Sequence, residues 1–154
     1  MIITAHLLTG VAIGSASGEI LPALFLGYFS HFFLDMLPHW DITLHTKSDL
    51  SGKLTSRDWL AIIIDGTISL ILFIIIINKT DNFWPIFAGA IGANLPDIFD
   101  NLPLWNKFFR HTPPFSYLWQ FHDDLHYQLK SEDWYWGLPL PIIIMGGLLW
   151  YLLG

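Results

Sequence analysis

Long blocks of hydrophobic residues, separated by polar stretches, dominate the pattern of this sequence. The clearest block, 59–77, reads WLAIIIDGTISLILFIIII and has about the 20 apolar residues that a helix needs to cross a bilayer. A second block, 137–153, reads GLPLPIIIMGGLLWYLL, in which Pro139 and Pro141 suit the first turn of a helix. The pattern therefore predicts membrane-spanning helices in both blocks.

Three further apolar helices are expected from shorter blocks. Residues 2–37 are apolar almost throughout but too long for one helix, and the SASGE segment with Pro22 divides them into helices at 4–16 and 22–37. The last block, 83–95, contains two glycines and ends before Pro96, which disfavours continuation of a helix. We therefore expect an all-α protein with one membrane-embedded domain over residues 1–154, built as a bundle of about five short transmembrane helices.

Composition agrees with an apolar environment and limits the chemistry. Of the 154 residues, 53% are hydrophobic and only 13% are charged, whereas soluble domains have roughly 25% charged residues. The formal net charge is −6 and no basic run occurs, which argues against nucleic acid as a partner. Because the chain has no cysteine, thiolate ligands are excluded, and any metal has to be held by His and carboxylate side chains.

The distribution of cationic residues sets the expected orientation. The two long loops between the predicted spans lie on one side of the membrane and contain Lys47, Lys53, Arg57, Lys107, Arg110 and Lys130. Only Lys79 lies in a loop on the other side. The positive-inside rule therefore predicts an integral protein of the cell (inner) membrane, with the N-terminus and both long loops in the cytoplasm. This orientation places the histidines on the cytoplasmic half.

The segment GYFSHFFLDMLPHWD, residues 27–41, carries the most specific candidate chemistry. His31 and Asp35 are four residues apart, so they share one face of a helix and could bind one metal. His39 and Asp41 follow Pro38 and could fold back over the same site. Ionisable groups in an apolar helix are unfavourable unless they are paired or bind a cation, which favours a metal or catalytic site. A buried His–Asp pair that only joins two helices is the alternative.

A second pair has the same spacing. In FHDDLH, His122 and His126 are four residues apart and could meet one metal if the segment is helical, although a solvated surface helix would also explain them. His6 and Asp97 lie near the ends of apolar helices and are further candidate ligands. An interfacial imidazole and a capping carboxylate are the alternatives for these two residues.

Other polar residues are candidates for catalysis and substrate binding. Asp65 is a single acid among isoleucines and could be a base, a ligand or a hydrogen-bonding group between helices. Arg110 and His111, close to Lys107, could bind a phosphate group. A basic cytoplasmic loop beside a membrane explains these three residues without a substrate, and we favour that interpretation.

Three motifs together, TAH near the N-terminus, GYFSHFFLDMLPHWD and NLPDIFD, resemble the membrane-bound metal-dependent hydrolases of bacteria and archaea. The HxxxD spacing is similar to that of zinc-dependent phospholipase C and its related nucleases, which are all-helical phosphoesterases. The resemblance implies the ligands His6, His31, Asp35, His39, Asp97, His122 and His126. The chain departs from these families in having HxxxH where the phospholipases have HxxxE, and only RHT where the membrane hydrolases have Arg-Gly-Thr-His-Ser.

These observations predict a membrane-bound metal-dependent hydrolase that cleaves a phosphoester, such as a phospholipid, at the cytoplasmic face. Zinc is the expected cofactor, with manganese or iron as alternatives, and membrane lipid is the expected partner. Asp41 or Asp65 would orient a water that the metal activates for attack on the phosphoester. Two alternatives stay open: a divalent-cation transporter or channel, and a non-enzymatic membrane scaffold that holds no stoichiometric metal.

Overall fold

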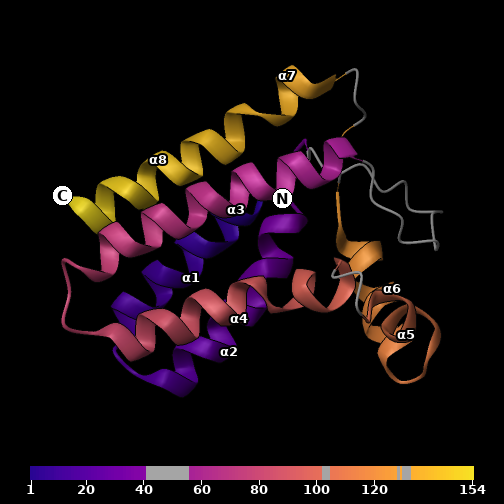
Figure 1. Ribbon diagram of the computed structural model, residues 1–154, viewed down its shortest axis with the longest axis horizontal. Coiled ribbons are helices and arrows are strands. Elements are labelled where there is room, and N and C mark those ends of the chain that lie inside the picture. Colours follow the sequence, from indigo (N-terminus) through magenta and orange to yellow (C-terminus); the bar gives the residue numbers. More distant parts are fainter. Residues whose placement is uncertain (41–55, 102–104, 128, 130–132) are drawn as a thin grey trace.

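The computed structural model describes residues 1–40, 56–101, 105–127, 129 and 133–154, and these residues form helices and no strand (Figure 1). The helices are α1 (Ile3–Ser17), α2 (Ile20–Asp35), α3 (Ser56–Ile77), α4 (Phe83–Asn101), α5 (Asn106–His111), α6 (Phe115–Leu125), α7 (Trp134–Gly137) and α8 (Pro139–Leu153). The all-α prediction is confirmed for this part of the chain, and α1, α2, α3 and α8 lie within a few residues of the predicted ranges.

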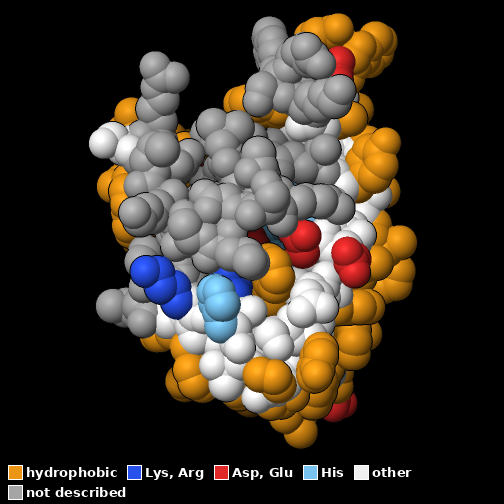
Figure 2. Space-filling model, turned by 90° about the vertical axis from the view of Figure 1, so that its right-hand side faces the viewer, with side chains coloured by type: hydrophobic (Ala, Val, Ile, Leu, Met, Phe, Trp, Pro, Cys, Tyr) orange, Lys and Arg blue, Asp and Glu red, His pale blue; other side chains and the backbone are white. Residues whose placement is uncertain are grey.

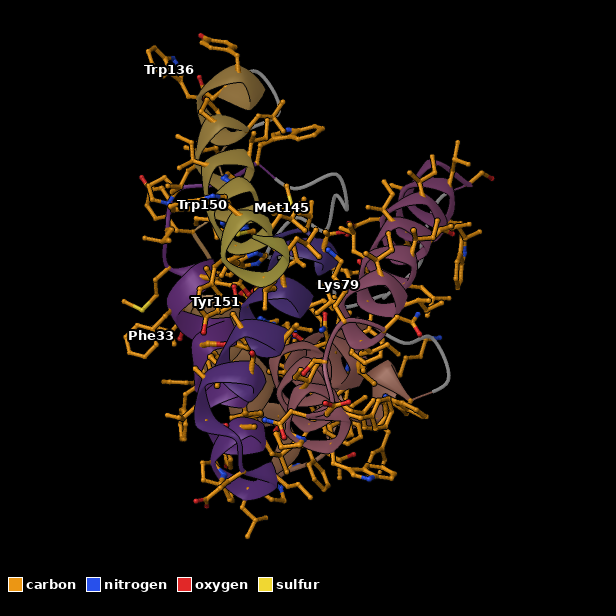
Figure 3. All side chains as sticks on the ribbon, turned by 90° about the vertical axis from the view of Figure 1, so that its left-hand side faces the viewer. Phe33, Lys79, Trp136, Met145, Trp150 and Tyr151 are labelled. Carbon is orange, nitrogen blue, oxygen red and sulfur yellow. The ribbon has the colours of Figure 1, made fainter. Side chains whose placement is uncertain are left out.

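Two stretches are long and apolar enough to cross a membrane, namely Trp59–Ile77 and Tyr135–Leu153. Helices α1 and α2 are apolar but have only 15 and 16 residues. Many large apolar side chains are exposed on α2, α3 and α8, with Phe33 70% and Trp150 82% exposed. Figure 3 shows Phe33 and Trp136 pointing away from the helices. Such a surface is compatible with a membrane environment.

The predicted end of the fourth apolar helix before Pro96 is wrong. Helix α4 continues through Pro96 to Asn101, although proline removes one backbone donor. Packing of α4 against α1, α2 and α5 offsets that loss. Asp97 and Asp100 therefore lie three residues apart on a helix, where such residues are neighbours. The long loop predicted after this helix also contains α5 and α6.

Helix α1 is the centre of the bundle, because it contacts α2, α3, α4 and α8. Glycines allow α1, α2 and α4 to approach one another closely. A Cβ atom on Gly10 would overlap the carbonyl oxygen of Gly89, and one on Gly27 would lie 2.6 Å from the same oxygen. Small residues at such contacts are typical of helix packing in membranes. The three helices can therefore bring side chains of α1, α2 and α4 into one site.

One end of the bundle gathers the polar residues. This end, on the right in Figure 1, carries α5 and α6, whereas the turn between α3 and α4 and the C-terminus lie at the opposite end. Figure 2 faces the polar end and shows acidic, basic and histidine side chains flanked by hydrophobic ones. Lys107 and Arg110 belong to α5 at this end, while Lys79 lies in the turn after α3. Lys79 therefore lies at the end of the bundle opposite Lys107 and Arg110.

Candidate metal centre

Seven His and Asp side chains meet at the polar end of the bundle, and they are the seven predicted ligands. We call them the His/Asp cluster: His6 of α1, His31 and Asp35 of α2, His39 after α2, Asp97 of α4, His122 of α6 and His126 after α6. Their ligand atoms form three groups within 4.8 Å: His6–His31–Asp97, His31–Asp35–His122 and Asp35–His39–His126. Because His31 and Asp35 each belong to two groups, the cluster is continuous.

Asp35 lies at the centre of the cluster and is 1% exposed. Its Oδ2 is 3.0 Å from His31 Nε2 and 3.2 Å from His122 Nε2. Its Oδ1 is 3.2 Å from His6 Nε2 and 3.7 Å from His126 Nε2. Adjacent ligands of a tetrahedral zinc ion lie roughly 3.3 Å apart at the usual bond lengths. The two carboxylate oxygens therefore face different histidines at distances that suit a carboxylate between two ions.

Two histidines are held by backbone carbonyl oxygens. His31 Nδ1 lies 2.7 Å from a carbonyl oxygen of α4, and His39 Nδ1 lies 2.8 Å from that of Leu37. A carbonyl oxygen only accepts, so Nδ1 donates its proton and Nε2 presents a lone pair in both rings. These Nε2 atoms face His122 Nε2 at 3.1 Å and His126 Nε2 at 2.9 Å. Two nitrogen lone pairs repel at such distances unless a proton or a metal cation lies between them.

His122 has the same arrangement with a carboxylate in place of the carbonyl. Its Nδ1 donates to Asp100 Oδ2 at 2.9 Å. Burial of His122 disfavours its charged form, but the hydrogen bonds with Asp100 and Asp35 outweigh this effect and raise its pKa to about 10. A proton therefore occupies the position that a metal would take on Nε2. The carboxylate–histidine pair is the support that metal-ligating histidines usually have.

His6 gives a separate test of whether a metal fits. The side chain is fully buried, its Nδ1 has no hydrogen-bond partner among the described residues, and its Nε2 lies 3.2 Å from Asp35 Oδ1. Its ring stacks on His31 with centroids 4.0 Å apart, and Nε2 points close to Asp35. Adjacent ligands of a zinc ion lie at about this separation, so Nε2 of His6 and the Asp35 carboxylate fit a divalent ion between them.

A short extended pairing joins the end of α2 to the segment after α6. The amide of Tyr127 donates to the carbonyl oxygen of Asp35 at 2.7 Å, and that of His39 donates to the carbonyl oxygen of Tyr127 at 3.4 Å. This pairing positions His39 beside His126. The side chains of His126 and Asp97 are 25% and 24% exposed, in contrast to the other ligands. Within the described residues the cluster is therefore most open beside these two.

The HxxxH pair does not act as one unit. His122 lies in α6, whereas His126 follows the last residue of α6 and has φ −75° and ψ 106°. Their ring centroids are 5.9 Å apart. His122 belongs to the group with His31, and His126 to the group with His39. The two histidines thus serve neighbouring groups that share Asp35.

Sequence reasoning missed two groups at the cluster. Asp100, which supports His122, is not among the predicted ligands; the sequence left open whether it bridges metals or caps a turn, because α4 was expected to end before Pro96. Continuing the helix would have put Asp97 and Asp100 on one face. The α-amino group of Met1 lies 2.5 Å from Asp35 Oδ1 and 3.3 Å from His126 Nε2. No pattern of side chains indicates that contact.

Of the two predicted catalytic aspartates, only Asp65 is among the described residues, and it does not belong to the His/Asp cluster. Asp65 accepts hydrogen bonds from the amides of Ile3 at 2.6 Å and Thr4 at 3.3 Å, and from the Thr4 hydroxyl. These contacts satisfy donors in the first turn of α1, as a capping side chain does. A catalytic role of Asp65 stays a prediction. Asp41 lies outside the described residues.

The predicted substrate-binding residues differ in their surroundings. Arg110 is 7% exposed and its Nη2 donates to the carbonyl oxygen of Asp100 at 3.1 Å. Its guanidinium also lies over the Trp119 ring, 5.7 Å from the centroid. His111 is exposed and its Nδ1 donates to the carbonyl oxygen of Lys107 at 2.8 Å. The structure therefore places Arg110, through Asp100, next to the cluster and gives His111 a surface position.

No protein-family model matches the chain, and neither a curated protein nor a solved structure matches it. The interpretation of the cluster therefore depends on its own geometry and on general chemistry.

Proposed function

We propose that this protein is a membrane-bound metal-dependent hydrolase that cleaves phosphoesters, phospholipids among them, at the cytoplasmic face of the cell membrane. One observation carries the proposal: Nε2 atoms of buried histidines converge in facing pairs around the Asp35 carboxylate. Such an arrangement favours a cation between them. The resemblance of the motifs to membrane-bound metal-dependent hydrolases supports the same activity.

The His/Asp cluster has enough donors for two ions, with Asp35 between them. Zinc suits imidazole and carboxylate ligands, and manganese or iron are the alternatives. When bound, divalent ions lower the pKa of coordinated water and stabilise negative charge on a phosphoryl group. Arg110 forms an ion pair with Asp100 at 3.8 Å and so stabilises the carboxylate that supports His122, while a direct contact with substrate stays a prediction. The more open side at Asp97 and His126 offers a path for substrate.

We propose that α1, α2, α3, α4 and α8 form the five-helix membrane bundle. The stretches that include α3 and α8 are long enough to cross the bilayer. Helix α1 is shorter, but it packs against α2, α3, α4 and α8 and therefore needs no contact with lipid. The exposed apolar side chains of α2 support contact with acyl chains. The cations of α5 support a cytoplasmic location of the cluster.

Elemental analysis of protein purified in detergent without chelator tests the proposal. We expect near-stoichiometric zinc, manganese or iron in the wild type, and its loss in both His31→Ala and His126→Ala. His111→Ala is the matched control, because His111 is an exposed histidine outside the cluster. Hydrolysis of bis(p-nitrophenyl) phosphate and of phosphatidylglycerol vesicles should follow the metal content.

The other outcomes separate the alternatives. Absence of metal from the wild type would contradict the hydrolase and leave a scaffold whose His–Asp contacts only join helices. Stoichiometric metal without hydrolysis of either substrate would favour a divalent-cation transporter. Transport has less support in the structure, because the cluster lies at one end of the bundle rather than along a path through it.

A further inference from the structure

An apolar groove leads to the His/Asp cluster between α2, α4, α5 and α6. Most of its lining is aromatic or aliphatic, and the polar residues His122 and Asp100 lie in the same lining. Ligand pockets are mostly apolar with a few well-placed polar groups. The lining of the groove has this mixed character, which suits a ligand with an apolar part and a polar end.

Ring contacts place the apolar wall directly against the cluster. Phe32 of α2 lies edge-on to His122, with centroids 5.7 Å apart, and also edge-on to His31 at 5.7 Å. On the other wall, Phe109 stacks on Phe99 with centroids 4.9 Å apart. A ligand in the groove would thus contact hydrocarbon on two sides while one end reaches the metal-binding imidazole of His122.

The apolar character continues from the groove to the outer surface. Tyr28 lines the groove and lies edge-on to Phe29, which is 56% exposed. On α6, Leu118 lines the groove and is 56% exposed, and the nearby Phe121 is 54% exposed. Exposed apolar surface of this kind is unfavourable in water and is matched by lipid chains. The mouth of the groove therefore opens among side chains suited to the hydrocarbon of a bilayer.

We propose that this groove is a subsite for one hydrocarbon chain of an amphiphilic phosphoester whose polar head lies at the His/Asp cluster. The subsite rests on the proposed function for the identity of the head group. The apolar walls would bind the hydrocarbon chain, and metal ions held by the cluster would bind the anionic head. A water-soluble phosphoester would use the cluster alone and leave the groove without a ligand.

Photo-crosslinking tests the subsite without requiring turnover. The probe is phosphatidic acid with a diazirine in one acyl chain, diluted into phosphatidylcholine vesicles that contain the full-length protein. Mass spectrometry should find crosslinks to α4 and α6 beside the groove, as well as to the exposed faces of α3 and α8. Leu118→Trp, which narrows the mouth, should abolish the groove crosslinks and leave those on α3 and α8. Tyr117→Trp is the matched control, since Tyr117 is 64% exposed on the same helix.

Competition tests the position of the head group. Unlabelled lysophosphatidic acid should reduce the groove crosslinks more than a monoacylglycerol with the same chain, because only the former carries a phosphate. Equal competition by the two lipids would overturn placement of the head at the cluster. Crosslinks confined to α3 and α8, or groove crosslinks unchanged in Leu118→Trp, would overturn the subsite.

Metal analysis of the same samples separates this proposal from the hydrolase proposal. Stoichiometric metal without groove crosslinks would overturn the subsite and leave the metal centre in place. Groove crosslinks that respond to Leu118→Trp in a protein without metal would establish a lipid-binding groove and contradict the hydrolase.

Discussion

Replacement of Gly27 by alanine should disturb the metal centre although Gly27 is not a ligand. A Cβ atom there would lie 2.6 Å from the carbonyl oxygen of Gly89, whereas ordinary contact begins at 3.4 Å. The difference, 3.4 minus 2.6, requires α2 to move by about 0.8 Å relative to α4. Gly27 lies one and two turns before His31 and Asp35 on the same helix face. Ligand distances in metal sites lie within about 0.2 Å of their standard values, so a shift of this size should weaken binding.

The effect on stability can also be estimated. Overpacking of this kind costs about 1–3 kcal/mol, which for a chain of this length lowers Tm by roughly 2–12 °C. Gly146→Ala is the matched control, because no atom lies within 4 Å of its added Cβ and the helix should tolerate or favour alanine. Elemental analysis and thermal unfolding in detergent measure both effects. If Gly27→Ala kept the metal content and Tm of Gly146→Ala, close helix packing would not be what positions the cluster.

Three further predictions concern single groups. Asp100→Asn should weaken metal affinity by about 10- to 100-fold without loss of helix, because it weakens the hydrogen bond that orients the His122 ring. Titration with a competing chelator measures the affinity, and an unchanged affinity would exclude this role of Asp100. The pKa of His122 is raised to about 10, so below that pH a metal has to displace the proton on His122 Nε2. Apparent affinity should therefore rise roughly tenfold per pH unit between about pH 7 and 10, and a flat profile would contradict the raised pKa. Asp65→Ala should lower stability by about 0.5–2 kcal/mol through loss of the α1 cap, while a loss of turnover at unchanged Tm would instead support a catalytic Asp65.

His31 and Asp35 could be predicted from sequence because each is polar in an apolar context, whereas His122 and His126 were predicted from their spacing and from the resemblance. His31 and Asp35 occupy one face of an apolar helix, where an unpaired ionisable group is unfavourable, so a shared partner was the physical expectation. The i, i+4 spacing sufficed for the contact between them, which the structure has at 3.0 Å. The same local reasoning failed at Pro96, because packing of α4 against its neighbours, which no local pattern records, supports the helix beyond the proline.

The sequence by itself determined the five apolar helices apart from the end of α4, the apolar character of the bundle and the residue types able to hold a metal, because these follow from local composition and periodicity. Only the tertiary structure decided which of these residues meet. His6, Asp35 and His122 are far apart in the chain, and they come together through the close packing of α1, α2 and α4 at glycines and through the backbone pairing after α6. Asp65 was equally polar in an equally apolar helix, yet it lies beside the first turn of α1 and caps it. Contacts between distant segments depend on the shapes of packed helices, which no single segment encodes.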